Sequence, residues 1–394
     1  MVGLPPAVPV VSPGPVLTAA ERTRYARHLL LPGFGEEGQR RLRAARVLVV
    51  GAGGLGSPVL QYLAAAGVGR LTIVDDDAVD ETNLQRQVIH REESVGLPKV
   101  ESAAQAVRRL SSHVEVAALN ARLTADNVLE VLAGHDVVVD GADNFPTRYL
   151  VSDACARLGL PHVWGSIHRF DAQLSVWWAG RGPCYRCAFP IEPSGDAVPS
   201  CAVGGVLGAL CGTIGSLMAG EVITLVTGVG EPLVGRILVH DALTASFDVL
   251  PVGARTGCPV CGPNADSSRP LGTAPDAGGS ADSQAAPSEP VPAVSVVEAA
   301  ARLARSHPPL LLDVREPGER VVVALEGSVA IPLAELADRL DELPPDRPLL
   351  VLCKTGGRSA RATALLRAHE RDATNVEGGI LAWIAALRPD LPRY

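Results

Sequence analysis

A short apolar run that leads directly into a cluster of glycines constrains this chain more than any other feature. Residues 47–56 read Val-Leu-Val-Val-Gly-Ala-Gly-Gly-Leu-Gly, and Ser57-Pro58 then opens a helical pattern. Four consecutive apolar residues are typical of a strand that is buried on both faces. Glycines let the backbone approach a phosphate, and the following helix offers free N–H groups and the positive end of its dipole. The stretch therefore predicts a nucleotide site.

An acidic residue follows at the spacing that a ribose contact needs. A second strand is expected over 71–74, and it ends at Asp75. A carboxylate placed there can accept a hydrogen bond from a ribose hydroxyl. The same arrangement is typical of NAD-dependent oxidoreductases, so at this point a hydride-transfer enzyme and an ATP-using enzyme remain equally open.

Length, charge and hydropathy narrow the class of protein. The 394 residues exceed one ordinary domain and suggest two. The net charge of −8 argues against a broad nucleic-acid surface. The sequence has no uninterrupted run of 18 apolar residues, so we expect no membrane span. Residues 1–16 are rich in Pro and Val without a basic start, which predicts a disordered tail of a cytoplasmic protein and not a signal peptide.

Hydrophobic periodicity predicts alternating helices and strands around the glycine turn. Helices are expected over 18–30, 36–45, 57–66, 99–110, 125–133, 145–158 and 204–226, and strands over 47–50, 71–74, 114–119, 136–140, 161–167, 173–178 and 236–240. Thr18 and Glu21 have the spacing of a capping box, and Gly67 follows the helix 57–66 as a C-cap. This order predicts an open sheet whose ligands bind beyond the carboxyl ends of its parallel strands.

Charged residues gather where those carboxyl ends would lie. Asp75-Asp76-Asp77 would repel a phosphate unless a cation intervened, which indicates Mg²⁺. Lys99 suits a phosphate as a point charge, and an ordinary surface lysine is the alternative. Asp143 follows the strand 136–140, where a Mg²⁺ ligand or a general base would lie. The alternative for Asp143 is an N-cap of the helix 145–158.

Cysteines form two pairs with metal-ligand spacing. Cys184 and Cys187 make one Cys-x-x-Cys, and Cys258 and Cys261 make the other. Two such pairs are the usual ligands of a structural zinc site, although 70 residues separate them here. A redox pair or unpaired thiols are the alternative. Cys201 stands alone in Pro-Ser-Cys before the helix 204–226.

A second domain follows a compositional break. Residues 264–292 are mainly Pro, Ala, Ser, Gly and Asp and predict a flexible linker to a unit over 293–394. In that unit a strand ends at Cys353, and a loop of polar and small residues follows: Lys354, Thr355, Gly356, Gly357 and Arg358. Converging N–H groups, a helix dipole and two cations would lower the pKa of the thiol and bind an anion. The alternative is a buried, inert cysteine.

These motifs together carry a family resemblance. Residues 18–261 resemble the molybdopterin-synthase-activating and thiamine-biosynthesis adenylyltransferases, which are relatives of ubiquitin-activating enzymes. The resemblance lies in Arg24-Tyr25-Ala26-Arg27, Gly51–Gly56, Asp75-Asp76-Asp77, Asn83–Gln87, Lys99, Asp143-Asn144-Phe145 with Arg148, and the four paired cysteines. Residues 293–394 resemble a rhodanese domain through Asp313-Val314-Arg315, Ile331-Pro332-Leu333, the loop 353–358 and Glu377-Gly378-Gly379. One departure is Lys354, where the rhodanese loop usually has Arg.

The resemblance implies a fold and a nucleotide site. The fold would be α/β: a Rossmann-like ATP-binding domain over 17–263 with a largely parallel sheet and a Cys₄ zinc site, and an α/β rhodanese domain over 293–394. Asp143 would hold Mg²⁺, Asp75 the ribose and Lys99 the phosphates. The remaining nucleotide contacts would come from Gly54, Thr82, Asn83, Leu84, Gln85, Arg86 and Asn144. Arg27 would reach the phosphates of the partner subunit in a homodimer.

The resemblance also implies a protein substrate. A small ubiquitin-like sulfur carrier ending in Gly-Gly would be adenylated, and a persulfide on Cys353 would then deliver sulfur to give a thiocarboxylate. Cys201 matches a second reactive cysteine that would form a thioester or resolve an acyl disulfide. The sulfur would come from a cysteine desulfurase or from thiosulfate. An NAD-dependent oxidoreductase and a non-catalytic docking scaffold for ubiquitin-like proteins are the alternatives.

Overall fold

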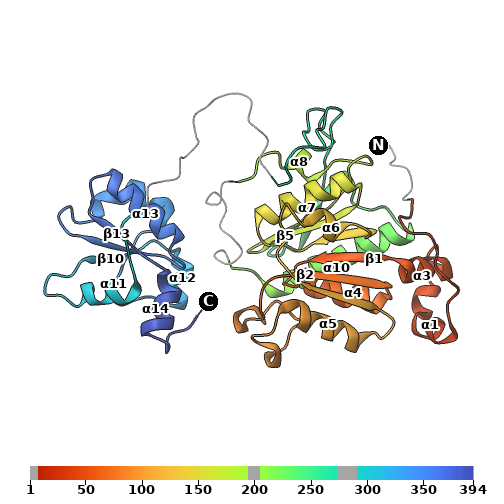
Figure 1. The fold of residues 1–394 in the computed structure, drawn as a ribbon, viewed down its shortest axis with the longest axis horizontal. Helices are drawn as coiled ribbons and strands as arrows, with labels where there is room; N and C mark the ends of the chain where they lie inside the picture. The colour runs from red at the N-terminus through yellow and green to blue at the C-terminus, as the bar shows by residue number, and fades with distance from the viewer. Residues whose placement is uncertain (1–7, 194–204, 273–290, 394) are drawn as a thin grey trace. The chain divides into compact units, whose positions relative to one another are not determined.

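The strand and glycine turn predicted from residues 47–56 lie at the centre of a large sheet. The computed structural model describes residues 8–193, 205–272 and 291–393, and the chain divides into two compact units, Met1–Asp276 and Ala277–Tyr394 (Figure 1). The strands of the first unit are β1 (Arg46–Val50), β2 (Arg70–Asp75), β3 (Glu115–Asn120), β4 (Val137–Asp140), β5 (His162–His168), β6 (Asp171–Trp177), β7 (Arg236–Asp241) and β8 (Ser246–Pro251).

The sheet is parallel in its first part and antiparallel in its last. Its order is β3-β2-β1-β4-β5-β6-β7-β8. Strands β3 to β5 of this order run parallel, whereas β6, β7 and β8 are antiparallel to their neighbours. The chain leaves β1 towards β2 on one side and reaches β4 on the other. This reversal opens a crevice at the carboxyl ends of β1 and β4, where doubly wound sheets bind ligands.

Helices cover both faces of this sheet, as Figure 1 shows. The helices of the first unit are α1 (Ala19–Arg24), α2 (Ala26–Leu29), α3 (Gly35–Ala44), α4 (Gly56–Ala66), α5 (Lys99–Leu110), α6 (Val128–Leu132), α7 (Phe145–Leu158), α8 (Tyr185–Ala188) and α10 (Gly208–Thr227). Val47 and Val49 pack with α4, α5 and α10, whereas Leu48 and Val50 pack with α6 and α7. Strand β1 is thus buried on both faces, as its unbroken apolar run predicts.

Three local predictions differ from the structure. The helix expected over 18–30 is broken at Tyr25, which is buried and packs its ring against Gly67. Part of the expected tail is packed: Val11 is buried, and Val10 N–H donates to the Leu225 carbonyl. The exposed strand β8 was not expected.

The linker predicted over 264–292 is described only in part. Residues 273–290 lie outside the described residues. Before them, Leu271 is buried beside α7, and Gly272 N–H donates to Asp153 at 3.0 Å. Leu271 and Gly272, which belong to the predicted linker, therefore pack on the first unit.

Helix α10 is a core helix with the composition of a membrane span. An 18-residue window within it has mean hydropathy 1.7, so by length and composition it could cross a membrane. Half of that window is buried, and Ile214, Met218 and Val222 are fully enclosed among α4 and the sheet. The core helix of a folded domain passes the same test.

The second unit is a smaller parallel sheet with helices on both faces. Its sheet has the order β11-β10-β12-β13-β9. The elements are β9 (Ala293–Val294), α11 (Val296–Leu303), β10 (Leu310–Asp313), α12 (Pro317–Val322), β11 (Val329–Ala330), η3 (Leu333–Glu342), β12 (Leu349–Leu352), α13 (Gly357–Ala368), β13 (Ala373–Val376) and α14 (Gly379–Leu387). One core layer packs α11 and α14, and the other packs η3 and α13. The central strand β12 delivers Cys353 to the start of α13.

Candidate functional site

A cavity of about 400 Å³ lies at the carboxyl ends of β1, β2 and β4. Among the residues expected at the nucleotide, it is lined by Gly54, Asp75, Asn83, Arg86, Lys99, Asp143 and Asn144. Thr82, Leu84, Gln85 and Arg27 do not line it. Segments far apart in the sequence therefore meet here, as the strand order predicts.

The glycine turn is held in place by hydrogen bonds to the N–H and the carbonyl of one residue, Ala52. Ala52 N–H donates to Asp75 Oδ2 at 2.8 Å, and Ala52 O lies 2.9 Å from His90 Nε2. The His90 ring is buried, and its Nδ1 lies 2.9 Å from Ser102 Oγ on α5. Burial is the main reason that the pKa of His90 is lowered. A neutral His90 that donates from Nε2 and accepts at Nδ1 satisfies both contacts.

The turn after β4 is held in the same way. Ala142 N–H donates to Asp140 Oδ1 at 2.9 Å, and Arg148 Nε donates to Ala142 O at 3.1 Å. The Arg148 guanidinium is buried beneath the cavity, over the rings of Phe145 and Trp164. In both turns of the cavity, an alanine N–H donates to the aspartate that ends the preceding or neighbouring strand. The carbonyl of the same alanine accepts from a nitrogen of a buried side chain.

Close backbone contact explains two of the glycines. Gly51 has φ +86°, and a Cβ there would lie 3.2 Å from Gly141 O. A Cβ on Gly56 would lie 1.9 Å from Gly51 O. Any side chain at Gly56 would therefore push apart the turn and the start of α4, which meet only because glycine lacks a Cβ.

Asp75 faces the cavity and also hydrogen-bonds the backbone of two neighbouring turns. Its two carboxylate oxygens accept N–H groups of Ala52 and Asp77, each at 2.8 Å. Burial raises the pKa of Asp75, against the opposing effects of Lys99 and these hydrogen bonds. A carboxylate has about four acceptor positions, so a ribose hydroxyl could still bind it.

Lys99 forms an ion pair with the acidic segment after β2. Its ammonium lies 2.7 Å from Asp77 Oδ2, and its side chain is 7% exposed. Carboxylate oxygens of Asp75, Asp76 and Asp77 come within 4.8 Å of one another, so these residues could also hold a cation. Lys99 offsets part of their mutual repulsion without any metal ion.

Asn83 positions Arg86 and Gln87 at another wall of the cavity. Its Oδ1 accepts from Arg86 NH2 and from Gln87 Nε2, both at 3.0 Å. Arg86 NH1 also donates to the Thr82 carbonyl at 3.1 Å. Thr82 therefore orients Arg86 and does not face the nucleotide cavity itself.

Asp143 is exposed at the cavity and is not a helix cap. Asn144 is the N-cap of α7, since its side chain accepts from Thr147 N–H at 3.0 Å. The alternative assignment of Asp143 as the cap is therefore wrong. Within the described ranges, the Asp143 carboxylate has no hydrogen-bond or ion-pair partner. An exposed carboxylate that faces a cavity is a suitable donor for Mg²⁺.

Sequence reasoning missed three residues at or beneath the cavity. Arg122 follows β3 and lines the wall, and Cys211 from α10 faces Gly54. His90 lies beneath the glycine turn. The position of Arg122 after a strand was a usable signal. Cys211 and His90 reach the cavity only through packing of distant elements, which no local pattern records.

The four paired cysteines converge to one cluster. Sγ of Cys184 lies 3.5 Å from that of Cys258, and Sγ of Cys187 lies 3.4 Å from that of Cys261. A tetrahedral zinc with Zn–S bonds of about 2.3 Å separates its sulfurs by about 3.8 Å, so the spacing fits. The hydrogen bond between Cys184 and Cys258 lowers the pKa of Cys258 and raises that of Cys184, so it favours a thiolate on one of the two.

A buried ion pair ties this cluster to α7. Arg186, between the first two cysteines, donates to Asp153 at 2.7 Å and 2.9 Å. Both side chains are buried, and the guanidinium stacks over the Tyr149 ring. The same Asp153 carboxylate receives Gly272 N–H. Asp153 therefore joins the cysteine cluster to the segment that precedes residue 273.

In the second unit, Cys353 lies at the start of a polar loop. Its Sγ receives Gly356 N–H at 3.1 Å and the Ser359 hydroxyl at 3.2 Å. Gly356 has φ +101° and lies against Gly378, which a Cβ would approach to 3.0 Å. Cys353 is 1% exposed, and both of its hydrogen-bond donors lie at the N-terminus of α13.

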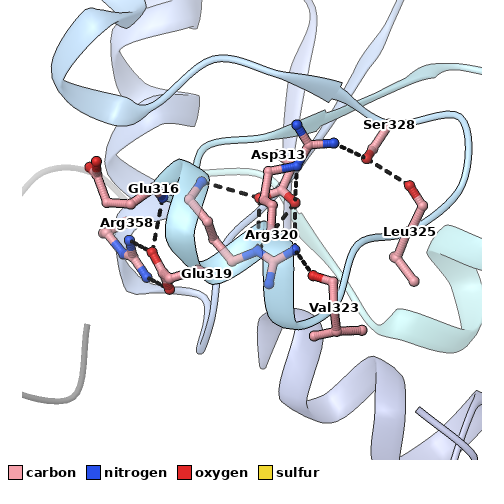
Figure 2. A network of polar contacts seen from close by, with 9 residues as sticks. Asp313, Glu316, Glu319, Arg320, Val323, Leu325, Ser328 and Arg358 are labelled. Carbon is pink, nitrogen blue, oxygen red and sulfur yellow. Dashed lines mark hydrogen bonds and ion pairs between the residues drawn. The ribbon is translucent and has the colours of Figure 1, made fainter. Parts of the chain in front are cut away.

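Arg358 is paired where the sequence suggested a free cation. Its NH1 and NH2 donate to the two carboxylate oxygens of Glu319, each at 2.7 Å (Figure 2). Lys354 and Thr355 complete the loop before Gly356 and Gly357. Cys201 lies outside the described residues.

Comparisons with known proteins agree with this arrangement. The ThiF family profile matches residues 25–260, and the rhodanese-like domain profile matches residues 295–386. The chain is 42% identical over 393 residues to the probable adenylyltransferase/sulfurtransferase MoeZ of Mycobacterium tuberculosis, covering 98% of each protein. It is 51% identical over 246 residues to the SAMP-activating enzyme E1 of Haloferax volcanii, covering 62% of this chain and 91% of that one.

A solved structure matches the fold of the first unit. The crystal structure of E. coli MccB with ATP superposes with a TM-score of 0.54 at 23% identity and covers 62% of this chain and 75% of that chain. At that identity the likeness shows the fold alone. The relatives and the two domain matches decide against the oxidoreductase and the non-catalytic scaffold.

Proposed function

We propose that this chain, which belongs to the ThiF family and is an adenylyltransferase and sulfurtransferase with a C-terminal rhodanese-like domain, converts the C-terminal carboxylate of a ubiquitin-like sulfur carrier into a thiocarboxylate. The observation that carries the first half is the cavity that brings the glycine turn, Arg86, Lys99 and the exposed Asp143 together. The observation that supports the second half is the hydrogen-bonded thiol of Cys353.

Activation is needed because a carboxylate has no good leaving group. The carrier carboxylate would attack the α-phosphorus of ATP, form a mixed anhydride with AMP and release pyrophosphate. Such a step requires mainly positioning and charge neutralisation. Arg86 and Lys99 supply positive charge, the glycine turn and the N-terminus of α4 supply N–H groups, and Asp75 supplies an acceptor for the ribose.

Asp143 is the residue that we assign to Mg²⁺. A bound Mg²⁺ neutralises charge on the phosphates during their transfer. The carboxylate is exposed at the cavity and lies in the same wall as Asn144, which caps α7. Because Arg148 holds the preceding carbonyl, Asp143 is presented at a defined position.

Sulfur delivery then uses Cys353. Its thiolate takes a sulfane sulfur from a donor, and the outer sulfur of the resulting persulfide attacks the carbonyl carbon of the adenylate. AMP leaves, and an acyl disulfide joins the carrier to Cys353. A second thiolate must attack Sγ of Cys353 to release the thiocarboxylate. We assign that attack to Cys201; the resulting disulfide needs an external thiol for its reduction.

The remaining assignments concern assembly and location. Arg27 is exposed on α2 and does not line the cavity of its own chain, which supports a role at a partner subunit's phosphates in a homodimer. The cysteine cluster would hold a structural Zn²⁺. We propose a cytoplasmic protein that acts on a carrier ending in Gly-Gly and takes sulfur from a cysteine desulfurase or from another sulfane donor.

The division of labour is tested with purified protein, MgATP, a Gly-Gly carrier and a sulfur donor. Cys353→Ala should abolish the oxygen-to-sulfur mass gain of the carrier and leave ATP–pyrophosphate exchange intact. Cys155→Ala is the matched control, because Cys155 is buried outside the cluster and the cavity. Loss of both activities in Cys353→Ala would refute the proposal.

A further inference from the structure

The ion pair between Arg358 and Glu319 changes what the Cys353 loop offers to an anion. Arg358 is the second residue of α13, next to the Ser359 that hydrogen-bonds the thiol. Both of its terminal nitrogens donate to Glu319, at 2.7 Å each. The Glu319 side chain is 3% exposed and that of Arg358 is 21% exposed. A buried bidentate pair of this kind is strong, so the loop gains a near-neutral pair and not a free cation.

The position of Glu319 is fixed by a network behind it, shown in Figure 2. Glu319 accepts Glu316 N–H at 2.9 Å in the capping box of α12. Asp313, which is fully buried, binds Arg315 at 2.6 Å and Arg320 at 3.4 Å. These contacts hold α12 against β10. The Glu319 carboxylate is therefore fixed in place, and the ion pair forms because the Arg358 guanidinium reaches it there.

The effect of cancelling the Arg358 charge on donor binding depends on the charge of the sulfur donor. Thiosulfate carries two negative charges and leaves as sulfite after the Cys353 thiolate has attacked its outer sulfur. A persulfide, RSSH, carries at most one negative charge. The thiolate attacks its outer sulfur, the S–S bond breaks, and RS⁻ leaves and takes up a proton. Either reaction forms one S–S bond and breaks another, so neither needs an oxidant.

We propose that Glu319 is a specificity-determining residue that makes this loop selective for thiol persulfides over thiosulfate. The carboxylate cancels the guanidinium charge that would otherwise attract a dianion. A neutral or singly charged persulfide loses much less electrostatic attraction through this cancellation than thiosulfate does. The loop N–H groups and the N-terminus of α13 still receive the donor in both cases. The inference rests on the sulfurtransferase half of the proposed function and does not involve ATP or the carrier.

The test compares two donors with the full-length chain. Sulfane sulfur on Cys353 is measured by cyanolysis after reaction with thiosulfate or with cysteine persulfide, whose net charge is at most −1. In Glu319→Gln the KM for thiosulfate should fall about tenfold, because one compensating charge is lost near a dianion. The rate with cysteine persulfide should stay within about twofold, and added salt should weaken the gain with thiosulfate.

Three variants separate charge from folding. Glu319→Asp keeps the charge and should keep the wild-type donor ratio. Glu298→Gln removes an exposed glutamate from an ion pair with Arg302 on α11 and is the matched control. In the double variant Glu319→Gln/Arg358→Gln the gain with thiosulfate should vanish, since the cation that is released by the first change is gone.

The outcomes are distinct. An unchanged donor ratio in Glu319→Gln, or parallel changes with both donors, overturns the inference while sulfur transfer itself stands. A wild-type chain that accepts sulfur from neither donor refutes the sulfurtransferase half of the proposed function, and the inference with it. Thermal unfolding of each variant shows whether the second unit is intact. If Glu319→Gln unfolds, Arg358→Gln decides the question, because it leaves the Glu319 charge uncompensated and should raise the KM for thiosulfate more than that for the persulfide.

Discussion

His90 Nε2 lies 2.9 Å from the carbonyl oxygen of Ala52, at the centre of the glycine turn. The ring reaches the turn from a loop 38 residues later in the sequence and rests on Ser102 of α5. Asp75 holds the N–H of the same alanine from the opposite side. The peptide groups of the glycine turn are therefore oriented by the buried His90 ring and by the half-buried Asp75 carboxylate.

Replacing His90 should weaken ATP binding more than it weakens the fold. His90→Phe keeps an aromatic ring but removes the donor to Ala52 O, and a lost hydrogen bond to a buried carbonyl costs about 1–3 kcal/mol. We expect the KM for ATP in pyrophosphate exchange to rise about tenfold or more. His135→Phe is the control, because His135 is a half-buried histidine bonded to Thr72 outside the cavity. Equal effects of the two changes would contradict the positioning role.

Acid should destabilise the first unit through two histidines. Burial lowers the pKa of both His90 and His135 below the ordinary value of 6.5. Between the lowered pKa and 6.5 the unfolded chain binds more protons than the folded chain, so the free energy of unfolding falls as the pH falls. Urea unfolding at a series of pH values below 7 should show this loss. A smaller slope is expected in His90→Phe, and an unchanged slope would count against a neutral buried His90.

Asp143→Asn should remove adenylation and spare sulfur loading. The amide keeps the shape of the side chain and loses the negative charge that a divalent cation needs. Pyrophosphate exchange should drop at least about a hundredfold, as is typical for loss of a group that stabilises a developing charge. Cyanolysable sulfur on Cys353 should be unchanged. Asp126→Asn, another exposed aspartate outside the cavity, serves as the control; an equal loss there would contradict the assignment.

Loss of one clustered cysteine should release metal and destabilise the first unit. Cys258→Ser replaces a soft thiolate by a hydroxyl, which is a poor zinc ligand. We expect about one equivalent of zinc per wild-type chain by elemental analysis and much less in the variant, with a lower melting temperature. Cys155→Ser changes a buried cysteine outside the cluster and should leave the metal content unchanged. A wild-type chain purified without zinc would contradict the assignment.

Apolar runs and helix caps in the sequence predicted the elements that line the site and the edge of the sheet at which it lies. Strand β1, the glycine turn, α4 with its Gly67 cap, and α5 from Lys99 to Leu110 all follow from apolar runs and caps, and the α/β class is confirmed. Because parallel strands present their carboxyl ends at one edge, the same reasoning brought Asp75 and Asp143 to one cavity.

Partners across packed elements were not predictable in this way. Arg358 was expected to act as a free cation, yet Glu319, 39 residues earlier, pairs with it. His90 was not recognised at all, since its contact with Ala52 depends on how α5 packs beside the turn. The packing of Leu271 and Gly272 on the first unit was likewise not predicted, because it depends on contacts with α7, which include one carboxylate. Sequence periodicity reports which face is buried, and it does not report which buried polar groups meet.

The paired restraint of Ala52 and Ala142 has a consequence for the thermodynamics of nucleotide binding. A flexible phosphate loop loses backbone freedom when it closes on its ligand, at about 1–2 kcal/mol for each residue that becomes fixed. Here both alanines are already held at N–H and carbonyl before any ligand arrives. Most of that ordering entropy is therefore lost during folding, so calorimetry on the wild-type chain should show a smaller entropic penalty for ATP than calorimetry on His90→Phe.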